Sequence, residues 1–404
     1  MSRARFPALT TFICTTILSN SALAGAYQLY ELGTPVIGTA AVGQAVANDA
    51  STAFLNPAGM GFLPDTQFML GSQIIMPYTN FSKNSLNTIS GDNGGNAGLL
   101  TPGMDIYYSY NLSPCLKLGL SVASPYGGAL NYDDGWTGRY VVQDAMFYTI
   151  NINPSIGYRV NQWLAVGAGA SIEYMNLTQT TAFAIEHLVD GQIDVKTDNY
   201  APGFNLGVMF APYASTKIGI AYRSKINHDL HGQLTFLRID RAPNTSLNMV
   251  SPQNIIASAS HDFSDRFTLL AEAGWSNWSS MKNTTLNVGD RSVITPLNWK
   301  NTYRAGLGGR FNATPALTLQ AGVSYDSSPT TTENRLPSLP MDRQIRVGTG
   351  VLYSMLKTVQ LGFSYEYWNL GSADIHNTSS NGVLSGSYSR NYANVVQASI
   401  NVGV

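Results

Sequence analysis

Several stretches of the chain alternate in polarity every second residue, and this alternation restricts the possible folds more than any other feature. In "TYRAGLGGRF" (302–311), Tyr303 and Leu307 fall on one face while Arg304 and Arg310 fall on the other. The runs "LTLQAGVSYD", "VQLGFSYEY" and the C-terminal residues 396–404 repeat the pattern. Because successive side chains of a strand point to opposite faces, a period of two predicts β-strands and not helices.

The shortage of charge indicates which kind of β-protein this is. Charged residues make up 12% of the chain, about half of the ~25% that is usual in soluble domains. A soluble sandwich would carry more charge on its wetted faces. Beyond residue 24, no stretch has the ~20 continuous apolar residues of a membrane helix. These features predict an all-β membrane barrel, in which alternate residues face lipid. The net charge of −1 argues against a nucleic-acid partner.

The first 24 residues have the pattern of a secretory signal peptide. Arg3 and Arg5 precede the mostly apolar run 6–18, and Ala-Leu-Ala at 22–24 forms a small-x-small cleavage site. The apolar run is too short to cross a bilayer. We therefore expect residues 1–24 to be removed on export.

The connections between strand-like runs allow the strands to be counted. Six short connections are expected at 111–117, 159–163, 211–217, 262–267, 311–316 and 353–358. Seven longer ones are expected near 82–102, 127–142, 177–200, 227–251, 279–298, 327–341 and 371–387. Thirteen connections predict a 14-stranded antiparallel transmembrane β-barrel over residues 66–404, beginning near Thr66. An even number of strands places both termini at the end with the short turns, which is the periplasmic end in such barrels.

Residues 25–65, here called the plug segment, precede the first predicted strand. The segment is too apolar to remain dissolved and too short to build a core of its own. Its stretch "ANDASTAFLNPAGM" (47–60) has neither a helical nor a strand period, and Pro57 has no amide hydrogen. A lumen of this width is not filled by its own strands, and irregular backbone is tolerated there because it does not face lipid. We therefore expect an N-terminal hatch, or plug, inside the barrel.

Several motifs together resemble the FadL-type family of outer-membrane transporters for long-chain fatty acids and other hydrophobic compounds. The resemblance covers nearly the whole mature chain. It rests on "GAYQLYELG" (25–33), "NDASTAFLNPAGM" (48–60), "SPYG" (124–127), "DDGWTGRY" (133–140), "ININPSIGYRVNQWLAVGAG" (150–169), "LNWKNTYRAGLGGRF" (297–311), "LTLQAGVSYDSSP" (317–329) and "RLPSLPMDR" (335–343). One departure is the C-terminal Val404, because many outer-membrane barrels end in an aromatic residue that serves assembly.

The resemblance implies passive uptake of a hydrophobic ligand through an internal pocket and a lateral opening at a kinked third strand. It implies the following positions: pocket and hatch at Tyr27, Leu29, Tyr30, Asn56, Pro57 and Ala58, and the kink at Ser124, Pro125, Tyr126 and Gly127. From their side chains, we expect Trp136, Arg139 and Tyr140 to contact a ligand head group such as a carboxylate. Each motif also has a structural alternative. The Asn-Pro pair is compatible with a simple chain reversal, Ser-Pro-Tyr-Gly with a surface turn, and the last three residues with a structural cluster in an outer connection.

Two other functions remain as alternatives. A general diffusion porin for small polar solutes would share the barrel and its composition, but it would lack an apolar N-terminal plug. An outer-membrane enzyme is disfavoured because the chain has no Gly-x-Ser-x-Gly motif and its five histidines have no diagnostic spacing. With Cys115 as the single mature cysteine, neither an intrachain disulfide nor a thiolate metal site is expected. We expect no cofactor, a monomer, and contact with outer-membrane lipids and lipopolysaccharide.

Overall fold

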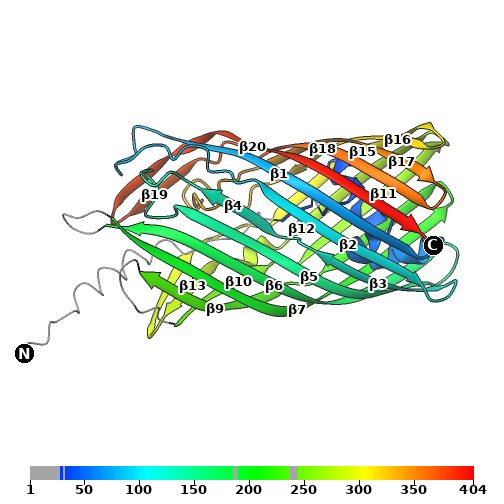
Figure 1. Cartoon of the computed structure of the whole chain (residues 1–404), viewed down its shortest axis with the longest axis horizontal. Coiled ribbons are helices and arrows are strands. Elements are labelled where there is room, and N and C mark those ends of the chain that lie inside the picture. Colours follow the sequence, from blue (N-terminus) through cyan, green and yellow to red (C-terminus); the bar gives the residue numbers. More distant parts are fainter. Residues whose placement is uncertain (1–27, 31, 185–189, 237–243) are drawn as a thin grey trace, which may run out of the picture.

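The computed structural model describes residues 28–30, 32–184, 190–236 and 244–404. It is an antiparallel β-barrel whose first strand, β1, pairs with both β2 and the last strand, β20 (Figure 1). This pairing closes the sheet. The wall has fourteen strands, which confirms the predicted fold class. The signal peptide and Tyr27 lie outside the described residues.

Eight of the wall strands are continuous and six are divided in two. The continuous strands are β1 (Gln67–Lys83), β2 (Thr101–Asn111), β5 (Asp144–Arg159), β6 (Leu164–Phe183), β7 (Gly191–Tyr213), β16 (Leu317–Asp326), β17 (Gln344–Leu356) and β20 (Gly382–Gly403). The divided strands are β3 (Leu116–Ala123) with β4 (Gly127–Asn131), β8 (Thr216–Arg223) with β9 (Ile226–Phe236), β10 (Asn244–Ser251) with β11 (Asn254–Ser264), β12 (Phe267–Ser276) with β13 (Asn283–Val288), β14 (Arg291–Pro296) with β15 (Thr302–Thr314), and β18 (Val359–Asn369) with β19 (Ile375–Ser379).

The two faces of each strand follow the alternation in the sequence. In β15, the side chains of Tyr303 and Leu307 are 62% and 57% exposed on the outer surface, whereas Arg304 is 4% exposed in the lumen. Lumen charges pair with each other: Arg304 Nε lies 3.0 Å from Glu272 Oε1, and Arg346 Nη1 lies 2.6 Å from Asp326 Oδ2. The apolar outer surface therefore suits lipid, while these charged groups are paired inside.

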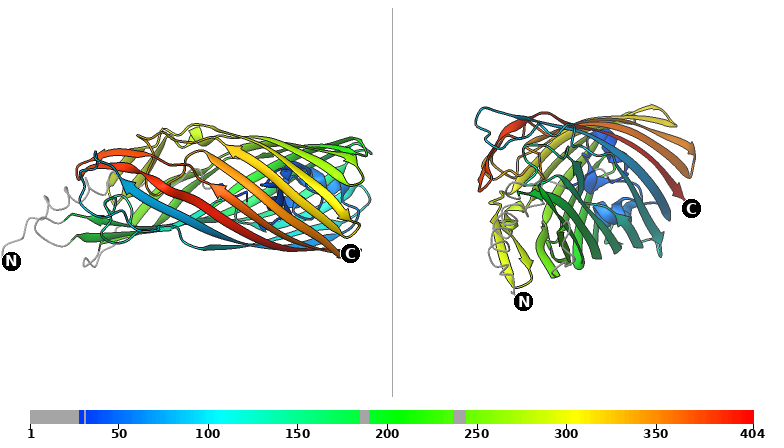
Figure 2. Two further views of the ribbon diagram at one scale, coloured as in Figure 1. Left: turned by 90° about the horizontal axis from the view of Figure 1, so that it is seen from above. Right: turned by 60° about the vertical axis from the view of Figure 1, so that its left-hand side comes forward.

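The described part of the plug segment, residues 28–30 and 32–65, lies inside the barrel, toward the end that carries the short turns and the C-terminus (Figures 1 and 2). It forms only short helices: η1 (Pro35–Thr39), η2 (Gln44–Val46), α2 (Thr52–Leu55) and η3 (Pro57–Phe62). One further short helix, η4 (Trp278–Ser280), lies between β12 and β13. Among the described helices, none is long and apolar enough to cross a membrane.

Glycines on the inner wall allow the plug backbone to approach the strands closely. A Cβ on Gly71 would lie 1.9 Å from Gly33 O, and one on Gly219 would lie 1.9 Å from Ala45 O. A Cβ on Gly322 would lie 2.2 Å from Thr39 O. These separations are far below van der Waals contact, so a side chain at any of these wall positions would displace the plug backbone. Much of the glycine in the sequence therefore serves to fit the plug.

Four of the seven predicted long connections are largely strand, which corrects their expected extents. Residues 177–200, 227–251, 279–298 and 371–387 contain the outer ends of β6 and β7, most of β9 and β10, the β13–β14 hairpin, and β19 with the start of β20. Their outward side chains are mostly polar, whereas buried residues such as Leu230, Leu247 and Leu286 face the interior. The apolar outer face that marks the membrane part of the wall is therefore missing there. The backbone ladder needs no apolar side chain, and the strands continue. The six short connections lie where they were expected.

Candidate functional site

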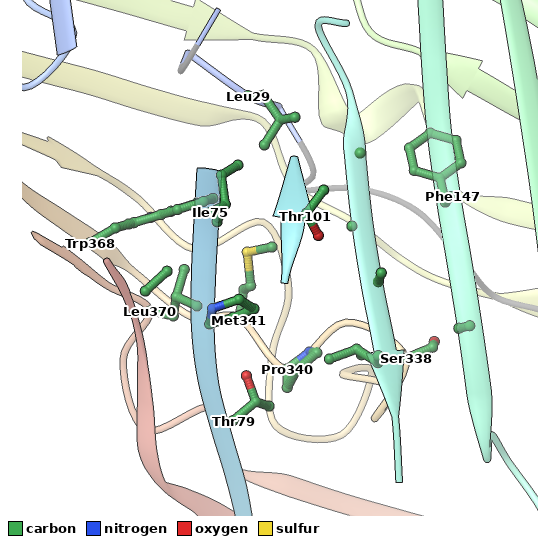
Figure 3. A pocket seen from close by; sticks show the side chains of 17 residues that line it. Leu29, Ile75, Thr79, Thr101, Phe147, Ser338, Pro340, Met341, Trp368 and Leu370 are labelled. Carbon is green, nitrogen blue, oxygen red and sulfur yellow. The ribbon is translucent and has the colours of Figure 1, made fainter. Parts of the chain in front are cut away.

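An apolar pocket occupies the lumen between the plug segment and the end with long connections. Its volume is about 70 Å³, enough for several water-sized groups but well below the roughly 300 Å³ at which ordinary ligand pockets begin. Figure 3 shows Leu29 at one end of the pocket and Thr79, Ser338 and Pro340 at the other. Its lining consists of Leu29, Ile75, Pro77, Thr79, Thr101, Gly127, Gly128, Ala129, Leu130, Ala145, Phe147, Ser338, Pro340, Met341, Trp368, Leu370 and Ala393.

The chemistry of this pocket is that of a hydrocarbon site. Within the described part of the chain, no charged side chain lines it, and its polar side chains are hydroxyls only. Phe147, Met341 and Trp368 contribute large apolar surfaces. Each methylene of a ligand gains about 0.8 kcal/mol on leaving water for such surroundings. The pocket therefore favours alkyl or aromatic groups over polar solutes.

The barrel wall beside the pocket is interrupted. Strand β3 ends at Ala123 and β4 begins at Gly127. Strand β2 pairs with β3 through residues 106–111, but among the described residues no ladder joins residues 101–105 of β2 to β4. Pro125 lies in the gap and has no amide hydrogen to donate to a ladder. The wall thus has an unpaired seam between β2 and β4.

A recess of about 320 Å³ lies at this seam and reaches the outer surface of the barrel. It includes Met146 and Ile150, which are 43% and 38% exposed on the lipid-facing side of β5. The residues lining both this recess and the apolar pocket are Leu29, Ile75, Thr101, Gly127, Gly128, Ala129 and Phe147. The pocket and the outer recess are therefore adjacent across the seam.

The plug segment supplies a partner for the interrupted strand. Leu29 N donates a hydrogen bond to Pro125 O over 2.9 Å, and Gln28 forms an isolated bridge with Tyr126. The next described residue, Tyr30, is buried and donates from its hydroxyl to Asp326 Oδ1 over 3.3 Å. Its ring centroid lies 4.1 Å from Arg304 Cζ. The structure thus brings Leu29 together with Pro125, Tyr126 and Gly127, while Tyr30 joins the lumen charges.

The Asn56-Pro57-Ala58 motif lies elsewhere in the plug. Asn56 Oδ1 accepts from Ala58 N over 3.2 Å, and Asn56 Nδ2 donates to Ala45 O over 2.8 Å. Cβ atoms on Gly167 and Gly207 of the wall would lie 2.4 Å from Ala58 N and 2.0 Å from Asn56 Oδ1. None of the three motif residues lines the apolar pocket or the outer recess. Their visible role is to fold the plug and seat it against the wall.

Trp136, Arg139 and Tyr140 lie in the connection between β4 and β5, outside the apolar pocket. Arg139 Nε is 2.7 Å from Asp190 Oδ2, so this guanidinium already has an acidic partner. The Tyr140 hydroxyl also donates to Asp190. Burial raises the pKa of Tyr140, with Arg139 opposing the shift and Asp190 adding to it. Trp136 is fully buried and donates from Nε1 to Val142 O. Arg139 also borders a separate polar cavity.

Phe147, Met341 and Trp368 were not singled out in the sequence, although two of them carry a recognisable signal. Phe147 and Trp368 are large apolar residues at strand positions that otherwise hold polar lumen side chains. An aromatic residue on the inner register of a barrel strand therefore indicates a pocket wall. Met341 belongs to a connection without a period and gives no such signal. In the described part of the chain, no group of three or more acidic, histidine or cysteine side chains could hold a metal ion.

Comparisons with known proteins agree with this architecture. A family model described as outer membrane protein transport protein (OMPP1/FadL/TodX) matches residues 15–402. A putative outer membrane protein of Neisseria meningitidis is 25% identical, with 87% of this chain and 88% of that protein aligned. The long-chain fatty acid transport protein of Escherichia coli is 24% identical, with 87% and 90% aligned.

Solved structures show the same fold. The crystal structure of a Pseudomonas aeruginosa FadL homologue aligns with a TM-score of 0.86 at 22% identity, covering 94% of this chain and all of the other. That of the Pseudomonas putida toluene transporter TodX aligns with a TM-score of 0.65 at 14% identity, covering 95% and 98%. The match of the family model to almost the whole chain is the finding that assigns the family. The chain belongs to the OMPP1/FadL/TodX family of outer membrane transport proteins.

Proposed function

We propose that this protein mediates passive uptake of hydrophobic molecules, such as long-chain fatty acids, across the outer membrane. The ligand is held in the apolar pocket and leaves sideways through the seam between β2 and β4. The observation that carries the proposal is the sharing of seven lining residues by the pocket and the outer recess. The proposal is supported by Leu29, Ser124, Tyr126 and Gly127, which line the pocket or the outer recess.

A lateral path suits such ligands better than an axial one. The plug segment lies across the lumen and contacts strands around the barrel, so a straight path to the short-turn end would have to displace it. A hydrocarbon that moves from an apolar pocket into lipid never re-enters water and keeps its transfer free energy. No energy source is required, because net flow follows the concentration gradient. The names of relatives, a fatty acid transporter and a toluene transporter, support a hydrophobic ligand class.

The proposal is tested by uptake of a fluorescent long-chain fatty acid into cells that lack their own transporter and express this chain. We expect uptake that saturates with ligand concentration and persists when the energy supply of the cell is abolished. Electrical conductance of the purified protein in a planar bilayer is measured in parallel. Steady ion or sugar conductance without fatty acid uptake would contradict the proposal and favour a diffusion porin.

A further inference from the structure

One wall of the apolar pocket is built from a connection and not from strands. Ser338 and Pro340 line the pocket at the end opposite Leu29, and Met341 lines it between them and Leu29 (Figure 3). They belong to residues 336–341, here called the roof segment, in the connection between β16 and β17. Leu339 and Met341 are 2% and 8% exposed. The roof segment therefore separates the pocket from the end of the barrel with long connections.

The roof segment is held by side chains and not by a β-ladder. Among the described residues, no strand pairing includes 327–343. Arg335, just before the segment, has a side chain that is 3% exposed. Its Nε donates to Met341 O over 2.9 Å, and its Nη2 donates to Asp342 Oδ1 over 3.0 Å. Its Nη1 donates to Asp374 O over 2.5 Å. One guanidinium thus joins the two ends of the segment to each other and to the β18–β19 connection.

Two further side chains hold the middle of the roof segment. The Tyr132 hydroxyl, at the end of β4, donates to Pro337 O over 2.8 Å and lies 2.7 Å from the Tyr388 hydroxyl of β20. Asn391 Nδ2 donates to Pro340 O. These are individual polar bonds, each contributing on the order of 1 kcal/mol, whereas a strand in the wall is held by a continuous ladder. The roof segment is therefore fastened by individual bonds and by the packing of Leu339 and Met341, and not by a ladder.

From these contacts we propose that Arg335 is a positioning residue and that the roof segment is a gate that ligand displaces to reach the pocket. This inference rests on the proposed uptake of hydrophobic molecules. The cavity of about 70 Å³ is too small for a long alkyl chain, so part of its boundary has to move. Displacing the roof segment uncovers Leu339 and Met341, and an alkyl chain covers the same surface again. A polar solute cannot replace that contact, so the gate itself selects against polar solutes.

The gate is tested by locking it reversibly. Pro340 and Asn391 are replaced by cysteine together in a Cys115→Ser background, and disulfide formation is quantified by mass spectrometry. We expect uptake of a pyrene-labelled dodecanoic acid to fall at least about tenfold after oxidation and to return after reduction. Undiminished uptake by fully oxidised protein would overturn the proposal that the roof segment is a gate. Ligand would then have to reach the pocket through the seam. Absence of uptake by the reduced protein as well as the wild type would instead contradict the proposed function.

A second measurement does not depend on the disulfide. Arg335→Gln removes hydrogen bonds from a charged group. The loss of one such bond shifts the equilibrium between the closed and the displaced roof segment roughly ten- to hundredfold. We expect both capture and release of the same probe to accelerate about tenfold or more in stopped-flow experiments, because opening limits both steps. The matched control is Arg343→Gln, since Arg343 is exposed and donates to Asn369, which does not line the pocket. If the release rate of the probe changed while its capture rate stayed the same, Arg335 would have a merely structural role. That result would overturn the proposal that the roof segment is a gate.

Discussion

The backbone amide of Leu29 donates to the carbonyl oxygen of Pro125 across 2.9 Å, so the plug segment takes up a bond that the interrupted wall strand leaves open. Leu29 also lines both the apolar pocket and the outer recess. A ligand that passes between the two cavities therefore has to pass this residue. We therefore expect the bond to couple the position of Leu29 to the width of the seam.

Removing the amide donor tests this coupling. In Leu29→Pro the bond to Pro125 is lost, and we expect the plug terminus to separate from the seam. A Gln28→Cys reporter in a Cys115→Ser background should then react with a polar maleimide several-fold faster, up to about tenfold for one hydrogen bond. Leu29→Ala keeps the donor and is the control. Equal labelling of both variants would show that the bond does not hold the terminus.

Closing the passage between the two cavities should stop transport without unfolding the barrel. A Cβ on Gly127 would lie 3.4 Å from Leu29 Cδ1 and 3.5 Å from Phe147 O, which is ordinary contact. Gly127→Ala is therefore expected to leave fatty acid uptake and the amount of folded protein nearly unchanged. The longer side chain of Gly127→Leu fills the passage, and we expect fatty acid uptake to fall on the order of tenfold. Uptake is compared at equal amounts of folded protein, and transport retained by Gly127→Leu would exclude the seam as the exit.

Much of the wall could be predicted from the sequence because lipid outside and a polar lumen inside impose alternation. Tyr303 and Arg304 fall on opposite faces for that reason. The β13–β14 hairpin was expected to be a loop, since the outward side chains of residues 283–296 are largely polar and the apolar residues, such as Leu286, face the interior. A backbone ladder forms regardless of side-chain polarity, and hydrophobicity cannot reveal it.

The pocket was less predictable than the wall. Leu29 and the seam residues could be placed because they lie in recognisable motifs. The roof segment lies in such a motif as well, but its position over the pocket depends on the contact of Pro337 with Tyr132, which lies 205 residues away in the chain. Arg139 was expected near a ligand head group, but its contact with Asp190 is a long-range pairing that spacing does not specify. Contacts of this kind arise from the closed barrel and not from local sequence.

The close fit of plug and wall predicts a strong effect from a single methyl group. In Gly322→Ala the new Cβ would lie 2.2 Å from Thr39 O, so either the strand or the plug has to shift. We expect a loss of about 1–3 kcal/mol in the free energy of unfolding. Gly403→Ala is the matched control, because its Cβ would find its nearest atom at 3.8 Å. Denaturant titration in detergent measures both variants, and equal midpoints would show that the plug is loosely seated.

A buried ion pair, Glu272 with Arg304, fixes the plug to the wall. Glu272 accepts from Gly43 N over 3.0 Å and from Gln44 N over 2.9 Å. Its partner Arg304 donates from Nη2 to Ala40 O over 2.8 Å. The pair therefore binds both sides of one plug turn. Ala40 adopts φ 55, a left-handed conformation that costs a residue other than glycine roughly 1–2 kcal/mol, so this turn depends on such external partners.

Arg304→Met should release the turn and leave the Glu272 carboxylate buried without its cation. We expect a destabilisation of about 3–5 kcal/mol, because removing one member of a buried pair strands the other charge. The control is Asp229→Asn, which breaks a pair with side chains 67% and 59% exposed and should cost less than about 1 kcal/mol. Release of the plug should also admit ions, so planar-bilayer conductance is expected to rise in Arg304→Met alone. Unchanged stability and conductance would mean that wall glycines, and not this ion pair, retain the plug.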